Sequence, residues 1–426
     1  MEMTEIPAEA SRRLQELGTA DIVVGIPSFN SADTIGHVVR TVQQGLHQYF
    51  PVARGIIVNS DGGSNDGTAE QVMDESWPDG PVTQVSPRAH PVEKLSTPYF
   101  GIPGKGSALR LVLEIARSLG AKACAVVDSD VRSIRPEWVQ LLVRPVLEQG
   151  FDFVAPYYLR HKFDGTITNS VVYPLTRALY GRRIRQPLGG EFCFSAPLIE
   201  HYLRQDVWNT DVARFGIDVW LTTQALCGGF RPCQVFLGAK IHNPKDPASD
   251  LSSMLAQVLG ATFAEMARNA MVWQKVRTSE PVATFGEVGL VETEPVRVNV
   301  RQMIDSYRMG YENLAGIWRL VLPPATLLEL QRLARRPDSD FVFPDEVWVR
   351  LVYDFAIAHH LRLMNRDHLL RGLTPLYLGR VASFVLEMES ADAVAVENGI
   401  EELCVRYEKE KPYLISRWRS PDRFRP

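Results

Sequence analysis

The chain has 426 residues, of which 45% are hydrophobic and 23% charged, and 46 basic against 50 acidic residues give a formal net charge of -4. These values are typical of a soluble globular protein with two or three domains. Because there is no basic excess, they argue against nucleic acid or an anionic membrane as the main partner.

The cysteines and the hydrophobic runs indicate the cellular compartment in which we expect the protein. The five cysteines are scattered without metal-ligand spacing, which favours a reducing cytoplasm over a disulfide framework. The N-terminal stretch 1–21 is polar and acidic, unlike a signal peptide. No run of about 18 apolar residues is present, so we expect no membrane span.

The first 130 residues predict an α/β half built from strand–turn–helix units, which favour a parallel sheet with crossover helices. The predicted helices of this half are 7–17, 32–50, 68–75 and 107–119, and the predicted strands are 21–26, 55–58, 82–85 and the run that ends at 128. The stretch 77–99 is rich in proline and polar residues, and apart from the strand at 82–85 we expect it to be a long loop.

The middle of the chain continues the alternation of helices and strands. Helices are predicted at 136–150, 166–180 and 215–227, strands at 151–158 and 235–241, and a strand or short loop from 187.

From about residue 252 the periodicity predicts helices almost alone, for example at 254–270, 324–334, 346–363, 376–389 and 391–407, with a softer linker at 277–297. We therefore predict two domains, 1–250 and 251–426. The second domain carries no nucleotide-loop or metal signature of its own and is interpreted as a packing or oligomerisation module. Apolar positions such as Trp348, Leu351, Val352 and Phe355 predict that it covers the first domain and builds a homo-oligomer.

The first chemical motif is the apolar run 125–127 followed by Asp128, Ser129 and Asp130. If the run is a strand, alternation points both carboxylates to the same side at its carboxyl end, where α/β sheets bind ligands. Mg²⁺ or Mn²⁺ prefers such oxygen ligands and bridges well to phosphates. The alternative is a polar strand end that caps the next helix.

The second motif is Gly104-Lys105-Gly106-Ser107, directly before a predicted helix. The glycines would let the backbone approach a ligand, the helix N-terminus favours an anion, and Lys105 adds a charge for phosphate. The alternative is a glycine-rich turn with a solvated lysine. The spacing fits neither a Walker loop nor a dinucleotide-binding fingerprint.

Two loops and one histidine further along the chain are the remaining candidates for ligand or metal binding. Pro27-Ser28-Phe29-Asn30 ends the first strand, where a nucleotide base could dock, and the loop 59–68 with Asp61 could hold uracil or ribose. Taken singly, they are equally well a strand exit and a turn. His242 ends a late strand and could complete the metal shell, although a lone histidine is more often structural.

Together these motifs resemble the GT-A glycosyltransferases, and among them the retaining glucosylglycerate synthase and glucosyl-3-phosphoglycerate synthase group. The resemblance spans roughly residues 20–245. It is carried by Pro103-Gly104-Lys105-Gly106, Asp128-Ser129-Asp130, Pro187-Leu188-Gly189-Gly190-Glu191, Phe215-Gly216-Ile217-Asp218 and His242.

The resemblance implies a GT-A-like, Rossmann-type sheet, mostly parallel, with helices on both faces and a helical C-terminal domain. It implies a nucleotide-diphosphate sugar donor, UDP- or GDP-glucose, and a divalent metal held by Asp130 and His242. The donor-binding residues would be Pro27, Ser28, Asn30, Ser60, Asp61, Lys105, Asp128 and Ser129. The acceptor-binding residues would be Thr166, Thr168, Gly189 and Gly190, with Glu191 and Asp218 as catalytic candidates.

One position departs from the phosphoglycerate-using relatives, in which an Arg-x-Thr element binds the acceptor phosphate. The segment here reads Thr166-Ile167-Thr168, so a threonine stands in place of the arginine. Because a phosphate dianion prefers charge-assisted partners, the change favours a non-phosphorylated acceptor such as D-glycerate. The cluster Arg182, Arg183 and Arg185 could compensate, which leaves 3-phosphoglycerate open.

The sequence therefore predicts a metal-dependent, retaining glycosyltransferase that moves a hexose, preferably glucose, to D-glycerate or a close relative and makes a compatible solute. Glucosyl-3-phosphoglycerate and mannosylglycerate-type synthases are the nearest alternatives. A sugar-1-phosphate nucleotidyltransferase should carry a glycine-rich, arginine-containing loop after the first strand, which residues 27–30 lack. A non-catalytic nucleotide-binding or scaffold protein would not need the full set of phosphate and metal candidates.

Overall fold

The computed structural model describes residues 6–74, 90–241, 251–287, 293–294, 296 and 298–419. Contacts divide the chain into two compact units. The sheet unit contains residues 1–159, 184–243 and 282–294, and the helical unit contains 160–183, 244–281 and 295–426. Compared with a single boundary at 250, two segments are exchanged: 160–183 lie in the helical unit and 282–294 in the sheet unit.

The sheet unit is organised around an eight-stranded sheet with the strand order β10-β8-β5-β7-β4-β1-β2-β3. In the part of the chain that the structure describes, β7 alone runs antiparallel to its neighbours, and the remaining pairs are parallel. The strands are β1 Ile22–Ser28, β2 Gly55–Asp61, β3 Glu93–Pro98, β4 Ala123–Val126, β5 Phe153–Leu159, β7 Phe192–Ser195, β8 Pro232–Ala239 and β10 Ala283–Phe285.

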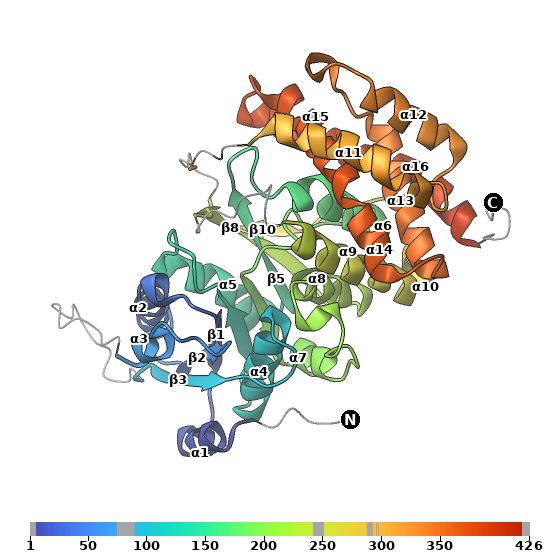
Figure 1. Ribbon diagram of the computed structural model, residues 1–426. Helices are drawn as coiled ribbons and strands as arrows, with labels where there is room; N and C mark the ends of the chain where they lie inside the picture. The colour runs from blue at the N-terminus through green and yellow to red at the C-terminus, as the bar shows by residue number, and fades with distance from the viewer. Residues whose placement is uncertain are drawn as a thin grey trace. The chain divides into compact units, whose positions relative to one another are not determined.

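Helices cover both faces of this sheet (Figure 1). Strand alternation explains the two layers, because Val23 of β1 enters one apolar core while Ile22 and Val24 enter the other. The first core includes residues of α1 Ala8–Leu17, α4 Lys105–Ser118, α7 Ala196–Leu203 and α8 Ile217–Cys227. The second includes residues of α2 Ala32–Tyr49, α3 Thr68–Asp74 and α5 Pro136–Gln149. The predicted fold class, a mostly parallel α/β sheet, is confirmed.

Most predicted elements occur within a few residues of their expected bounds, but one predicted strand falls outside the structure and two observed strands of the sheet, β3 and β10, were not predicted. The strand at 82–85 lies outside the described residues. Strand β3 lies in the stretch expected to be loop, and β10 lies in the expected linker. Both are short and carry few large apolar residues, so their pairing with β2 and β8 decides their conformation rather than local pattern.

The helical unit consists mainly of helices, several of which gather in the orange and red part of Figure 1. They are the π-helix Thr168–Val172, α6 Tyr173–Tyr180, α9 Leu251–Arg268, α10 Ala270–Trp273, α11 Val300–Trp318, α12 Pro324–Ala334, α13 Asp345–Leu361, α14 Arg366–Gly372, α15 Thr374–Met388 and α16 Ala393–Arg419. Two short strands, β6 Arg182–Arg183 and β9 Glu280–Pro281, pair with each other in the same unit.

The apolar face of α13 is buried inside the chain. Trp348, Leu351, Val352 and Phe355 are each 0% exposed. The indole of Trp348 donates a hydrogen bond to the Ser170 carbonyl at 2.9 Å, within the same unit. The interpretation of these four residues as a surface for a second copy was therefore wrong, because the monomer already covers them. The homo-oligomer itself stays a prediction.

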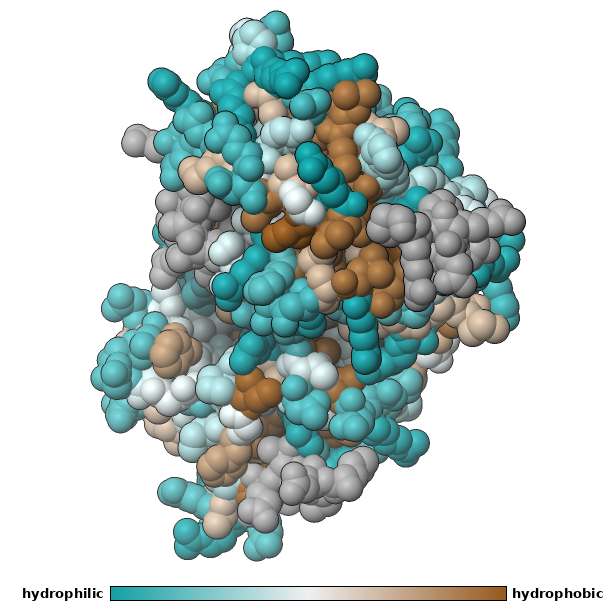
Figure 2. Space-filling model, turned by 45° about the vertical axis from the view of Figure 1, so that its right-hand side comes forward, coloured by the Kyte–Doolittle hydropathy of each residue, from teal (hydrophilic) through white to brown (hydrophobic). Residues whose placement is uncertain are grey.

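One described helical stretch, 366–388, is apolar and long enough to cross a membrane, but 67% of its most apolar segment is buried inside the protein. It is thus accounted for as packed helix. Other large apolar side chains are exposed, and Figure 2 shows apolar groups in brown between hydrophilic ones on one face. In the helical unit the exposed ones are Met271, Val272, Met309, Leu320, Leu328, Val342, Leu363 and Val394.

Candidate active site

The predicted site residues of the sheet unit lie where strand ends meet. Strands β1, β2 and β4 are parallel and in register, so the segments that follow them leave from one edge of the sheet. Strand β7 runs the other way and begins at this edge, with Phe192 paired to Val126. Glu191 therefore stands beside Asp128, whose backbone N–H donates to the Glu191 carboxylate at 3.4 Å.

Asp128 is held between two lysines. Its Oδ1 lies 2.7 Å from the Lys105 ammonium, and its Oδ2 lies 2.8 Å from the Lys240 ammonium. Strand β4 ends at Val126, so Asp128 and Asp130 lie in the turn beyond it. The expectation that strand alternation aims both carboxylates to one side was therefore wrong.

Lys240, at the end of β8, is the most connected group of this cluster. Its ammonium donates to the Gly189 carbonyl at 2.9 Å and to both Glu191 oxygens at 2.9 and 2.8 Å, in addition to Asp128. The Tyr158 hydroxyl also donates to Glu191, whose side chain is fully buried. Glu191 thus has no open path to a ligand in this structure, and its contacts suit a residue that fixes its neighbours.

Lys105 and Asp218 are more exposed to solvent than Lys240 and Glu191. They belong to the first turns of α4 and α8, and the Lys105 ammonium lies 3.3 Å from Asp218 Oδ2. The other Asp218 oxygen, Oδ1, is buried and has no hydrogen-bond partner among the residues that the structure describes. A buried acceptor without a partner is costly, so this oxygen is suited to a hydroxyl of a bound molecule.

Three carboxylates share two ammonium groups here, and burial and these charges shift the pKa values of the groups. Burial alone would raise the pKa of Asp128, but Lys105 and Lys240 outweigh it and hold that pKa well below its usual range. Burial raises the pKa of Glu191 and of Asp218 against the opposing lysines. Burial would lower the pKa of Lys105, but Asp128 and Asp218 hold it above its usual value.

The glycines of the motifs serve close packing within the protein. A Cβ on Gly190, which has φ +91°, would lie 2.2 Å from Asp128 Oδ2 and 2.8 Å from the Lys240 ammonium. A Cβ on Gly106 would lie 1.8 Å from the Val212 carbonyl oxygen. The expectation that Gly104 and Gly106 leave room for a ligand was therefore wrong, because a turn at 211–213 fills that space.

The loops after β1 and β2 form a hydrogen-bonded network of their own. Asp61 accepts from the Ser28 hydroxyl at 3.0 Å and from two backbone N–H groups, those of Gly63 and Ser64. Ser60 is fully buried, and its hydroxyl has no hydrogen-bond partner among the described residues, so its contact with a donor stays a prediction.

The remaining residues that were predicted to bind the sugar donor differ in their exposure to solvent. Pro27 is buried in β1, and Ser129 is buried with its hydroxyl 3.0 Å from that of Ser31. Asn30 is exposed, with the unusual φ of +47°. It is the member of this group best placed to meet a ligand.

The predicted metal ligand Asp130 is half-buried, and no hydrogen bond or ion pair of its carboxylate is found among the described residues. His242 lies outside those residues. Ile241, which precedes it in the sequence, accepts from the Arg132 backbone N–H at 2.9 Å, so the chain approaches the Asp130 turn just before His242. Within the described ranges no three His, Cys, Asp or Glu side chains are grouped to hold a metal ion. Asp130, an available carboxylate at the sheet edge, fits one hard-cation ligand.

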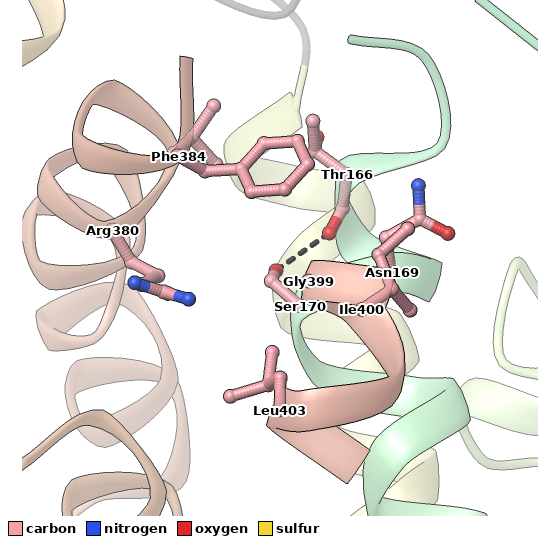
Figure 3. A pocket seen from close by; sticks show the side chains of 9 residues that line it. Thr166, Asn169, Ser170, Arg380, Phe384, Gly399, Ile400 and Leu403 are labelled. Carbon is pink, nitrogen blue, oxygen red and sulfur yellow. Dashed lines mark hydrogen bonds between the residues drawn. The ribbon is translucent and has the colours of Figure 1, made fainter. Parts of the chain in front are cut away.

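The predicted acceptor residues Thr166 and Thr168 belong to the helical unit. The Thr166 hydroxyl lies 2.6 Å from the Tyr377 hydroxyl. The Ser170 hydroxyl donates to the Thr166 carbonyl, as Figure 3 shows. Thr166 lines a small pocket of this unit together with Asn169, Ser170, Arg380, Val381, Phe384, Gly399, Ile400 and Leu403 (Figure 3).

The basic cluster that could replace the missing arginine has other partners. Arg182 pairs with Glu280 at 2.7 Å, and Arg183 donates to the Ser279 hydroxyl at 3.1 Å, both within the helical unit. Arg185 lies in the sheet unit, where its backbone N–H donates to Gln234.

Sequence reasoning missed Lys240 and Tyr158. Both belong to predicted strands, in which the apolar pattern indicates a strand but no site, and their partners are distant in the sequence. A usable signal was present: Lys240 interrupts an apolar stretch two residues before His242, and Asp128 and Glu191 need a counter-charge if they are buried.

A family model described as "Mannosylglycerate synthase, GT domain" matches residues 99–264, which is less than half of the chain. A search of curated proteins found no match.

Among solved structures, the chain is similar to glucosyl-3-phosphoglycerate synthase from Mycobacterium tuberculosis with Mg²⁺ and UDP. The identity is 23%, the coverage is 59% of this chain and 83% of that one, and the TM-score is 0.43. It is also similar to mannosyl-3-phosphoglycerate synthase from Rubrobacter xylanophilus, at 25% identity, 64% and 81% coverage and a TM-score of 0.45.

The matched segment carries Lys105, Asp128, Asp130, Glu191 and Asp218, four of which meet in one buried cluster. Residues 99–264 are therefore similar to the glycosyltransferase domain of mannosylglycerate synthase, and the cluster lies inside this similar segment.

Proposed function

We propose that this protein transfers a hexose from a nucleotide-diphosphate sugar to D-glycerate or a close relative, with retention at the anomeric carbon and with a divalent metal, Mg²⁺ or Mn²⁺. UDP- or GDP-glucose is the proposed donor and glucosylglycerate, a compatible solute, the proposed product. The observation that carries the proposal is the Lys105–Asp128–Asp218 cluster at the sheet edge, inside the segment that matches a glycosyltransferase family.

The donor would lie across the ends of β1, β2 and β4. Lys105 begins α4, so its ammonium and the first backbone N–H groups of that helix offer positive charge to a diphosphate. Asp130, together with His242, would hold the metal, which when bound supplies charge stabilisation to the departing diphosphate.

The acceptor and the transferred sugar would face Asp218, Gly189 and Gly190. The unpartnered Oδ1 of Asp218 would accept a hydrogen bond from a hydroxyl and so orient it. Glu191, buried behind the cluster, would hold Asp128 and the glycine turn in place. With no exposed carboxylate base assigned, the acceptor proton would leave with the diphosphate on the same face of the sugar.

The sugar and the acceptor each have an alternative. The family model takes its description from mannosylglycerate synthase, which favours mannose as the second candidate sugar. For the acceptor, Thr166 lacks the charge that a phosphate needs, whereas Arg182 and Arg183 already have partners, so D-glycerate is proposed over 3-phosphoglycerate.

A screen of donors against acceptors tests the proposal. UDP-glucose, GDP-glucose and GDP-mannose are each incubated with D-glycerate and with 3-phosphoglycerate, with Mg²⁺ or Mn²⁺ and with a chelator, and the product and its anomeric form are identified by NMR. We expect α-glucosylglycerate from D-glycerate, and no product in chelator. A tenfold or larger preference in kcat/KM for 3-phosphoglycerate would contradict the proposed acceptor.

Two other classes make different predictions. A sugar-1-phosphate nucleotidyltransferase would release pyrophosphate from a hexose-1-phosphate and a nucleoside triphosphate. A non-catalytic protein would bind nucleotide without turnover of any donor.

We further propose that the protein acts in the cytoplasm as a homo-oligomer. Five free cysteines support a reducing compartment. Light scattering at several concentrations tests the oligomer, and a monomer throughout would contradict it.

A further inference from the structure

Lys240 joins the ends of three strands of the sheet, β8, β7 and β4, through one ammonium group. It leaves β8 and reaches Glu191 and Gly189 before β7, and Asp128 after β4, at distances of 2.8 to 2.9 Å. Its ammonium also lies 5.5 Å from the centre of the Tyr158 ring of β5. The side chain is 5% exposed, so it lies behind the residues that could meet a ligand.

Folding alone does not explain this arrangement. Moving charges out of water is costly, and replacing a buried ion network by apolar residues of similar volume is often neutral or stabilising. Glu191, with 0% of its side chain exposed, would be replaceable by such a residue if it only filled space. The network instead fixes the carboxylate of Asp128 and the backbone of the Gly189–Gly190 turn, which are the groups assigned to donor and acceptor.

We propose that Lys240 is a positioning residue of the transfer reaction, acting through Asp128, Glu191 and Gly189. The inference rests on the proposed function and adds a residue to it. In this arrangement Lys240 keeps the turn at 189–190 against Asp128, so donor and acceptor meet groups that are already in place. Small misplacements of such groups lower the rate of the chemical step more than they weaken binding.

The test removes the positive charge of the Lys240 side chain and keeps a side chain of similar length. Lys240→Met in the full chain is compared with wild type and with Lys122→Met, which removes an exposed lysine that pairs with Asp21 at 2.8 Å. We expect Lys240→Met to lower kcat by about 100-fold while donor KM and nucleoside diphosphate affinity change by less than about threefold. Lys122→Met should keep kcat within about twofold of wild type.

A double-mutant cycle with Glu191→Gln separates positioning from a general loss of structure. If Lys240 acts through Glu191, the Lys240→Met/Glu191→Gln variant should lose no more kcat than the worse single variant. Losses in kcat that multiply would overturn the inference. The double variant also removes one of the charges left unpaired by Lys240→Met, so the test remains available if that single variant fails to fold.

The outcomes distinguish this inference from the proposed function. Wild-type protein without turnover of any donor would refute the proposed function. Active wild type with a folded Lys240→Met variant whose kcat stays within about twofold would overturn the role of Lys240 and leave the proposed function standing. A lower melting temperature with unchanged kcat for the folded fraction would also overturn it, since that is the signature of a structural residue.

Discussion

At the scale of single residues, the site depends on the absence of a Cβ atom at Gly190. An alanine there would place its Cβ 2.2 Å from Asp128 Oδ2, at a φ of +91°. We expect Gly190→Ala to lose about 2–4 kcal/mol of stability, from backbone strain and overpacking together, and nearly all activity.

Gly229→Ala is a matched control, because Gly229 also has a positive φ, +76°, but no atom within 4 Å of the added Cβ. It should show the backbone cost alone, about 1–2 kcal/mol, with normal activity. Chemical denaturation and turnover of both variants measure the difference. Equal losses in the two variants would show that the clash with Asp128 is relieved by a small shift.

Asp130 is the residue on which the metal prediction depends. Asp130→Asn should weaken Mn²⁺ binding in the presence of nucleoside diphosphate by about 10–100-fold, with little change in stability because the carboxylate has no described partner to lose. Titration calorimetry measures the affinity, and Asp33→Asn, on the exposed first turn of α2, is the control. Unchanged Mn²⁺ affinity would move the metal away from Asp130.

The sequence predicted most members of the cluster but not their pairing. Lys105, Asp128, Glu191 and Asp218 each stand in a short local motif, and such motifs can be recognised without a structure. Lys240 stands in no motif, and its partners lie 49 and 112 residues away. Long-range ion pairs are set by strand order, which local periodicity does not encode.

At the scale of elements, the start of α4 is shaped by its neighbour. Gly106 lies in the first turn of α4, where a Cβ would meet the Val212 carbonyl oxygen at 1.8 Å. We expect Gly106→Ala to destabilise the protein by about 1–3 kcal/mol and to weaken nucleotide binding, because Lys105 would shift with the helix start.

Gly316→Ala controls for helix propensity, since Gly316 lies in α11 with nothing within 4 Å of the added Cβ. That variant should be stabilised by up to about 1 kcal/mol. Thermal and denaturant unfolding of both proteins checks the opposite signs. A stabilised Gly106→Ala protein would mean that the turn at 211–213 can move aside.

Helices α13 and α16 are joined by a buried carboxylate whose protonation should be visible in stability. Burial raises the pKa of Asp354 to about 7 from an ordinary 3.8, although Arg417, Tyr413 and Arg350 oppose the shift. The folded state thus holds this proton more tightly than the unfolded state. Its contribution is full below the ordinary pKa and is lost as the pH rises through about 7.

Asp354→Asn removes this titration and keeps an oxygen acceptor for Tyr413. Between about pH 5 and 7, the free energy of unfolding of wild type should therefore fall relative to the variant, by at most about 1.4 kcal/mol per pH unit. Denaturant unfolding at several pH values provides the comparison. Parallel pH profiles for the two proteins would contradict the raised pKa.

Element prediction succeeded for several long helices and missed short strands. Helix α12 occurs at its predicted bounds, and α2 and α13 within two residues of theirs. Strand β10 has three residues and became visible only through its pairing with β8. A short strand of this kind carries too few side chains to show an alternation.

At the scale of the whole molecule, the two units are not two halves of the sequence. Residues 160–183 belong to the helical unit, where the fully buried Arg177 pairs with Glu408 of α16 at 2.8 Å. A chain cut after residue 250 would keep α6 without α16 and would lose β10. We expect residues 1–250 alone to be insoluble or inactive, because an arginine and an apolar helix face lose their cover.

Co-expression of 1–250 with 251–426 provides the control for that truncation, since both units can then reassemble from the pieces. Soluble yield and turnover measure the result. A soluble and active 1–250 fragment would show that the sheet unit is independent of everything after residue 250.

The exchange of segments also sets the order in which the protein can finish folding as it is made. Strand β10 leaves the ribosome after β8 and after 244–281, a part of the other unit. Until then β8 is an open sheet edge, the kind of surface that pairs with foreign strands. The nascent chain therefore passes through a stage in which both units are begun and neither is complete. We expect the yield of active protein in cells to depend on translation speed between residues 240 and 285 and on chaperones that shield the β8 edge.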